Sequence, residues 1–241
     1  MKTIFNYEPL TKKTIGITSY IGDLQVVDIP STIDGKRVTT IGAYAFKGCT
    51  SLTKVNIPNS VTRICDNAFS DCISLTEITI PDSVRSIGYE AFVNCKSLTE
   101  INIPDSVTCI GSCTFQCCTS LTEVNIPDSV TRIGPDAFGF CRSLSKVNIP
   151  DSVTRIGMFA FADCTSLTEI NIPDSVEFIE YQAFVNCKSL TKVTIPDSVE
   201  CISKYAFANC TSLTEINIPD SVEFIDDNAS VNYTSLTEGN I

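Results

Sequence analysis

A 23-residue repeat constrains the fold of this chain more than any other sequence feature. Leucine recurs at this spacing from Leu52 to Leu236, and eight full copies run from Leu52 to Ser235. Their consensus is L-T-E-I-N-I-P-D-S-V-T-R-I-G-x-x-A-F-x-x-C-x-S, and a longer copy of 28 residues precedes them at 24–51. One copy is too short to bury its apolar side chains alone, so the copies are expected to stack on one another.

Each segment of the consensus predicts its own local structure. The opening Leu-x-x-Ile-x-Ile alternates apolar and polar residues at its end, which is typical of a short strand with one buried face. Pro-Asp-Ser ends that strand in a turn, because proline lacks a ladder donor and Asp and Ser bond turn backbone. Val-x-x-Ile predicts a second short extended segment. Gly-x-x-Ala-Phe-x-x-Cys predicts a tight bend followed by one helical or 3₁₀ turn.

Stacking in register predicts an α/β-type solenoid that is mostly β. A parallel sheet is expected on one face, with short strands and 3₁₀ or helical turns on the others. Successive coils of such a stack lie about 4.8 Å apart, so identical side chains form columns. The repeat phenylalanine is expected to form one such column in the core: Phe46, Phe69, Phe92, Phe115, Phe138, Phe161, Phe184 and Phe207.

The two ends of the chain differ from the repeats and divide it into three parts. Residues 1–23 contain two short alternating stretches, which predict a hairpin-like cap on the first coil. Residues 24–235 are expected to form the solenoid, as one coil at 24–51 and eight coils at 52–235. For residues 236–241 two interpretations stay open: a polar terminal cap, or a truncated end with an exposed sheet edge.

The composition excludes much enzymatic chemistry. The 241 residues include no histidine, which rules out Ser-His-Asp and Cys-His catalysis and every metal site that needs an imidazole. The net charge of −11 disfavours a nucleic-acid surface. The chain shows no signal peptide and no 18-residue apolar run, so we expect no membrane insertion. The sequence predicts a non-enzymatic protein with no catalytic or cofactor-binding residues and no cofactor.

The 13 cysteines fall into two groups. Eight occupy one repeat position: Cys49, Cys72, Cys95, Cys118, Cys141, Cys164, Cys187 and Cys210. We interpret them as small core residues, because parallel side chains about 4.8 Å apart are too distant for disulfide geometry. Free thiols suit a reducing compartment. The other five are Cys65, Cys109, Cys113, Cys117 and Cys201.

No metal site is expected. Cys109, Cys113, Cys117 and Cys118 crowd one coil, but their spacing is not a usual zinc pattern. The aspartate of the Pro-Asp-Ser turn recurs in most copies, and turn preference explains it. Calcium binding by this aspartate column is the alternative.

The full pattern L-x-x-[IV]-x-I-P-x-S-V-x-x-I-G-x-x-A-F-x-x-C resembles the BspA-like (Treponema-type) leucine-rich repeats over about residues 24–235. The first coil, with its insertion near Ile29–Gly35, is similar to the opening coil of that family. The resemblance implies a curved, right-handed leucine-rich-repeat solenoid whose sheet lies on the concave face. It also implies cell-surface or adhesion roles through protein binding, with no enzymatic activity in the repeats. It does not identify a ligand, and the compartment stays open.

The outward positions of the expected sheet form the candidate binding site. They make a polar, mildly acidic strip without aromatic residues, which favours weak or multivalent contacts. A plain solvated face is the alternative interpretation. The strip residues are Lys54, Asn56, Glu77, Glu100, Asn102, Glu123, Asn125, Lys146, Asn148, Glu169, Asn171, Lys192, Glu215 and Asn217.

Two further hypotheses concern partners. Aromatic and sulfur-containing residues outside the strip offer an alternative contact patch on a flank. They are Phe178 and Phe224 at the Arg63 position of the repeat, and Tyr89, Met158, Phe159, Tyr181 and Tyr205 at the bend. The leading expectation is a scaffold that binds a protein or glycan ligand. The alternative is a structural solenoid that self-associates weakly, end to end, through its C-terminal edge.

Overall fold

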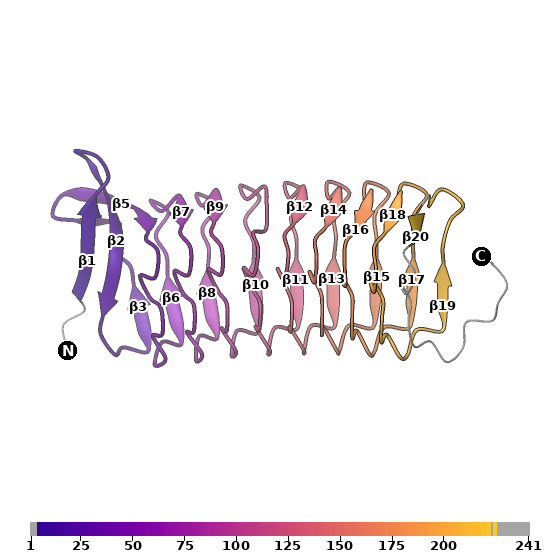
Figure 1. Cartoon of the computed structure of the whole chain (residues 1–241). Helices are drawn as coiled ribbons and strands as arrows, with labels where there is room; N and C mark the ends of the chain where they lie inside the picture. Colours follow the sequence, from indigo (N-terminus) through magenta and orange to yellow (C-terminus); the bar gives the residue numbers. More distant parts are fainter. Residues whose placement is uncertain (1–3, 223, 226–241) are drawn as a thin grey trace.

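The computed structural model describes residues 4–222, 224 and 225, and in it the chain winds as a stack of β coils. Figure 1 shows the coils in a single row between the β1–β2 hairpin at one end and β19–β20 at the other. The solenoid predicted from the repeat is confirmed. Among the described residues there is no helix, and hence no helical segment that could cross a membrane.

Three-residue strands form one face of the stack. They are β3 (Val26–Asp28), β6 (Lys54–Asn56), β8 (Glu77–Thr79), β10 (Glu100–Asn102), β11 (Glu123–Asn125), β13 (Lys146–Asn148), β15 (Glu169–Asn171), β17 (Lys192–Thr194) and β19 (Glu215–Asn217). They pair in parallel as β3-β6-β8, β10-β11-β13 and β15-β17-β19. Partners are equivalent residues of successive copies, such as Val124 and Val147, so the period of the sequence sets the register.

Shorter strands form the second face, where the Val-x-x-Ile segments predict extended chain. They are β7 (Arg63–Ile64), β9 (Ser86–Ile87), β12 (Arg132–Ile133), β14 (Arg155–Ile156), β16 (Phe178–Ile179), β18 (Cys201–Ile202) and β20 (Phe224–Ile225). Strands β12, β14, β16, β18 and β20 form one parallel sheet. An isolated bridge between Ile110 and Ile133 joins the coil before β12 to it.

The N-terminal end of the second face is extended by longer strands. They are β1 (Ile4–Pro9), β2 (Thr14–Ile21) and β5 (Lys36–Ile41), and the two-residue β4 (Thr32–Ile33) pairs antiparallel with β5. β1 and β2 form an antiparallel hairpin, and β2 pairs in parallel with β5, which continues to β7. The hairpin therefore covers the edge that β5 would otherwise expose.

The core is a set of side-chain columns. The eight repeat phenylalanines are at most 1% exposed. Neighbouring rings stack with centroids 4.9–5.5 Å apart and planes within 17° of parallel. Tyr20 of the hairpin stacks on Phe46 at 5.3 Å, which continues the column into the cap. The predicted phenylalanine column is confirmed.

The helical or 3₁₀ turn expected after each bend does not form in the described residues. Single turns form instead, because alternate backbone N–H groups point in different directions. In the coil of Phe92, the N–H groups of Ala91, Val93 and Cys95 bond carbonyls three residues back in the same coil. Those of Glu90, Phe92 and Asn94 bond carbonyls of the next coil. Stacking therefore takes every second donor that a helix would need.

The buried cysteine column has a hydrogen-bonding role. Each thiol from Cys72 to Cys210 donates to the carbonyl of the phenylalanine 26 residues earlier, at 3.1–3.3 Å. Each of these carbonyls also accepts the backbone N–H of the cysteine in its own coil, as Phe138 does from Cys141. The cysteine is thus a small core residue that also links adjacent coils.

Candidate binding surfaces

The polar strip predicted from the sequence lies along the three-residue strands, and its described side chains reach solvent. From Glu77 to Lys192 they are exposed, while Lys54 and Asn56 are half-buried. The side chain of Glu215 lies outside what the structure describes. The valine or isoleucine between each pair of outward residues is buried, which explains the polar-out alternation.

A hollow of about 340 Å³ lies on this strip over β13, β15 and β17. Its charged residues come from three successive coils in the order Lys146, Glu169, Lys192. Asn148 and Asn171 supply amide donors and acceptors beside them. Successive strands are only about 4.8 Å apart, so these groups lie close together. Their charges alternate from one coil to the next. The hollow, which we call the strip hollow, suits a ligand rich in polar groups.

The strip also contains an internal ion pair at its N-terminal end. Lys54 Nζ lies 2.6 Å from Glu77 Oε1, with both side chains at least 38% exposed. Such an exposed pair contributes little to stability, since water screens it. Among the described residues, no such ion pair involves Lys146, Glu169 or Lys192 of the strip hollow.

A second surface lies along the turns, where two residues in each coil have a left-handed backbone conformation with positive φ. Among the described residues, all those with positive φ belong to two columns with a 23-residue spacing, apart from Asp34 and Gly35 of the first-coil insertion. The first column is Tyr44, Asn67, Glu90, Cys113, Asp136, Phe159, Gln182 and Tyr205. The second column is Gly48, Asp71, Asn94, Cys117, Phe140, Asp163, Asn186 and Asn209. Asp, Asn and Gly are common in this conformation, and aromatic residues are not.

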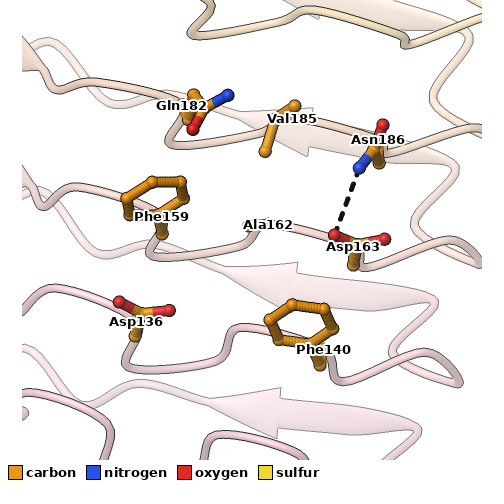
Figure 2. Close-up of a pocket in the computed structure, with 8 residues that line it drawn as sticks. All are labelled: Asp136, Phe140, Phe159, Ala162, Asp163, Gln182, Val185 and Asn186. Atoms are coloured by element: carbon orange, nitrogen blue, oxygen red, sulfur yellow. Dashed lines mark hydrogen bonds between the residues drawn. The ribbon is translucent and has the colours of Figure 1, made fainter.

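The two columns enclose a hollow of about 290 Å³. Figure 2 shows its four principal corners: Asp136 and Phe159 from the first column face Phe140 and Asp163 from the second. Ala162 lies between the columns, with Val185 on the next coil. We call this site the turn-face hollow. Because the residues between the columns are small, the surface is recessed there.

Hydrogen bonds fix the acidic corners of the turn-face hollow. Asn186 Nδ2 donates to Asp163 Oδ2 at 3.2 Å, shown as a dashed line in Figure 2. Gln116 Nε2 donates to Asp136 Oδ1 at 2.9 Å. Partial burial raises the pKa of Asp136, and the bond from Gln116 opposes that rise. Both carboxyl groups are therefore held in place, with oxygen atoms left to accept further bonds.

The aromatic patch predicted for the bend is only partly assembled. Phe159 and Tyr181 pack edge to face at 5.4 Å, and Tyr181 packs the same way on Tyr205 at 6.0 Å. Tyr89, 46% exposed, has no place in this cluster. Sequence reasoning did not identify Phe140 as a surface residue of interest, although the repeat pattern contains a signal for it. It is an aromatic residue at a position that most copies fill with Asn, Asp or Gly.

The extra cysteines do not assemble a metal site in the described part of the chain. Cys113 and Cys117 occupy the two left-handed columns, whereas Cys118 is buried in the core. No group of three or more Cys, Asp or Glu side chains within the described residues is placed to hold a metal ion. Burial raises the pKa of the Cys113 and Cys117 thiols, which lowers the thiolate fraction at neutral pH.

Comparison with known proteins identifies relatives with the same repeat. The family model described as BspA type leucine-rich repeat region, in six copies, matches residues 20–144 and 131–241. A leucine-rich repeat protein from Bacteroides ovatus is 33% identical, with a TM-score of 0.85 over 92% of this chain. This chain spans 59% of the length of that protein. Among curated proteins, none matches.

Two further solved structures resemble the chain. The T. pallidum leucine-rich repeat protein is 32% identical, with a TM-score of 0.64 over 91% of this chain and 90% of its own. A leucine-rich cell surface protein from Faecalibacterium prausnitzii is 23% identical, with a TM-score of 0.51 over 90% of this chain and 94% of its own, and shows only the shared fold. With its periodic core and the match of the family model along the repeats, this chain belongs to the BspA-type leucine-rich repeat family.

Proposed function

We propose that this leucine-rich-repeat scaffold is a non-enzymatic adhesion protein whose strip hollow binds a protein or glycan ligand. The carrying observation is the Lys146–Glu169–Lys192 row with Asn148 and Asn171 beside it, held on three adjacent strands. A rigid array of donors and acceptors binds polar ligands without a large entropy cost of ordering. The strip lacks aromatic anchors, so the affinity of one site is expected to be modest and to rise with multivalency.

Binding to arrays of immobilised glycans and of polypeptides tests this proposal. The variant Glu169→Gln/Lys192→Gln removes two opposite charges from the strip hollow and leaves polar amides in their place. The control, Glu177→Gln/Glu200→Gln, also removes two charges, from exposed residues beside β16 and β18, and raises the net charge by two. The proposal predicts that the first variant loses signal on the array members that bind the unmodified chain and the control retains it. Equal signals for all three proteins contradict it.

Self-association is a second candidate function. The C-terminal edge predicted for it, at residues 236–241, lies outside the described residues, and the N-terminal end offers a described edge. β3 is an edge strand of the three-residue face. Val26, the first residue of β3, is 50% exposed. Exposed apolar edge strands are templates for pairing with another chain. Val26→Lys is then expected to reduce the average mass measured by light scattering at high concentration, and a monomer at every concentration contradicts self-association.

A further inference from the structure

The first coils show how the left-handed columns hold a cation. Lys47 lies between the columns, immediately before Gly48, and its Nζ is 5.4 Å from the centroid of the Tyr44 ring. The same Nζ is 4.0 Å from Oδ2 of Asp71. An ammonium is attracted to the face of an aromatic ring and to a carboxylate. The chain therefore contains a Lys bound between an aromatic residue of the first column and an acid of the second.

The turn-face hollow combines an aromatic residue and an acid from the same two columns, without the lysine and in a different order of coils. Phe159 and Ala162 lie five coils after Tyr44 and Lys47, where Asn186 corresponds to Asp71. The acid of the hollow, Asp163, lies in the coil of Phe159, at the Gly48 position. Ala162 occupies the Lys47 position and is 2% exposed. Ala162 lines the hollow of about 290 Å³, and its short methyl group does not fill it.

Phe140 and Asp136 add a second ring and a second carboxyl group. Phe140 has a φ of 61°, in a column where the other residues of the chain are mostly Asn or Asp. A bulky residue in this conformation is uncommon and costs conformational energy, so backbone preference does not account for it. Its side chain lines the hollow instead.

A lysine also lies near an aromatic ring of the first column two coils further on. Lys204 Nζ lies 5.2 Å from the ring centroid of Tyr205, which follows Phe159 in the first column by two coils. Among the described residues, the ion pairs are Lys47–Asp71, Lys54–Glu77 and Arg155–Glu180, and none involves Asp136 or Asp163. The carboxyl groups of the hollow are thus available to a cation from another molecule.

We propose that the turn-face hollow binds the side chain of an arginine or lysine from a partner polypeptide, with its cationic head between Phe159, Phe140 and the two carboxyl groups. The net charge of −11 favours a basic partner. Arg142 and Lys188 are exposed, each two residues after a member of the second column. Their positive charges repel a run of basic residues in the partner polypeptide. A single basic residue between neutral ones therefore fits best.

The test uses the full chain and short peptides. Methyl resonances of Ala162 and Val185, both at the hollow, are followed by NMR during titration with acetyl-Ser-Gly-Arg-Gly-Ser-amide. The same peptide with citrulline in place of arginine keeps the shape and removes the charge. The expected result is a saturable shift of both methyls with arginine and at least a fivefold weaker response with citrulline. Equal responses overturn the proposal, and so does a response to a methyl glycoside with none to the arginine peptide.

Two variants separate the proposed contacts from general effects. Asp163→Asn keeps an acceptor for Asn186 and removes the charge, and binding is expected to weaken at least fivefold. Ala162→Lys restores the lysine of the first coil, and this built-in cation is expected to abolish peptide binding. The control Asp174→Asn removes a charge from an exposed turn aspartate and should leave binding unchanged. Unaltered binding by Asp163→Asn overturns the proposal. Neither variant touches the strip hollow, so this result and the array result are independent.

Discussion

At the scale of single residues, the core is one set of contacts repeated along the stack. The phenylalanine column follows from the sequence because a buried position that recurs every 23 residues must meet its own copies. The thiol bond from each cysteine to a phenylalanine carbonyl does not follow from it. That bond spans 26 residues and depends on the offset between neighbouring coils, which the repeat period alone does not determine.

Replacement of Phe138 tests the column. Its ring stacks on Phe115 at 5.5 Å and on Phe161 at 5.4 Å, so truncation removes contacts to both neighbouring coils. Phe138→Ala is expected to lower the free energy of unfolding by about 3–5 kcal/mol, measured by urea denaturation. Phe138→Leu, which fills more of the space, should cost less. A loss below about 1 kcal/mol for alanine would show that the column is not packed as described.

The buried thiols predict a loss of stability at alkaline pH. Burial raises the pKa above its ordinary value of 9.0 for Cys72, Cys95, Cys118, Cys141, Cys164 and Cys187. Above pH 9.0 the unfolded chain releases thiol protons that the folded chain retains, so the free energy of unfolding falls as pH rises. Each thiol contributes about 1.4 kcal/mol per pH unit in that range. Urea midpoints between pH 7 and pH 10.5 measure the slope. Cys164→Ala should reduce it by one thiol, and an unchanged slope contradicts the assignment.

At the scale of the coil, the turn after the bend is the element whose conformation the sequence did not predict. Gly-x-x-Ala-Phe-x-x-Cys has apolar spacing that fits a helical turn, and no residue in it forbids one. The structure forms two left-handed residues instead, because their N–H groups then bond the next coil. The strip residues were predictable, since strand alternation places them outward. The turn-face hollow was not, because it depends on the small residue Ala162 between two columns that stacking creates.

A substitution in the second column separates backbone preference from binding. Phe140 is left-handed where Asn94 and Asn186 have the residue type that this conformation favours. Phe140→Asn is expected to leave the free energy of unfolding unchanged or to raise it by about 0.5–1 kcal/mol. The same variant should bind the arginine peptide more weakly. Thermal denaturation gives the first quantity, and a clear loss of stability would show that Phe140 is a packing residue.

At the scale of the whole molecule, each coil contacts mainly its neighbours, so a coil is a removable unit. Deletion of residues 98–120 joins Ser97 to Leu121 and removes one complete copy, including three of the extra cysteines. We expect a folded protein whose urea m-value is lower by about one ninth, because one of nine coils no longer exposes surface on unfolding. Deletion of residues 98–119 leaves Ser120 as an extra residue at the junction, which strains the two coils that meet there while the later coils keep their mutual register. That variant should unfold at a lower urea concentration than the first, and equal midpoints of the two deletions would contradict the register argument.

The single-file arrangement of coils gives the molecule a mechanical character. Tension applied between its two ends acts along the stack and loads one coil interface at a time, so coils should detach in succession. Each detached coil releases 23 residues of chain, each up to about 3.6 Å long, while removing about 4.8 Å of stack. A force–extension trace should therefore show repeated steps of up to about 78 Å. Such a chain would lengthen in stages under load and so dissipate work, which is a useful property in a tether between two surfaces.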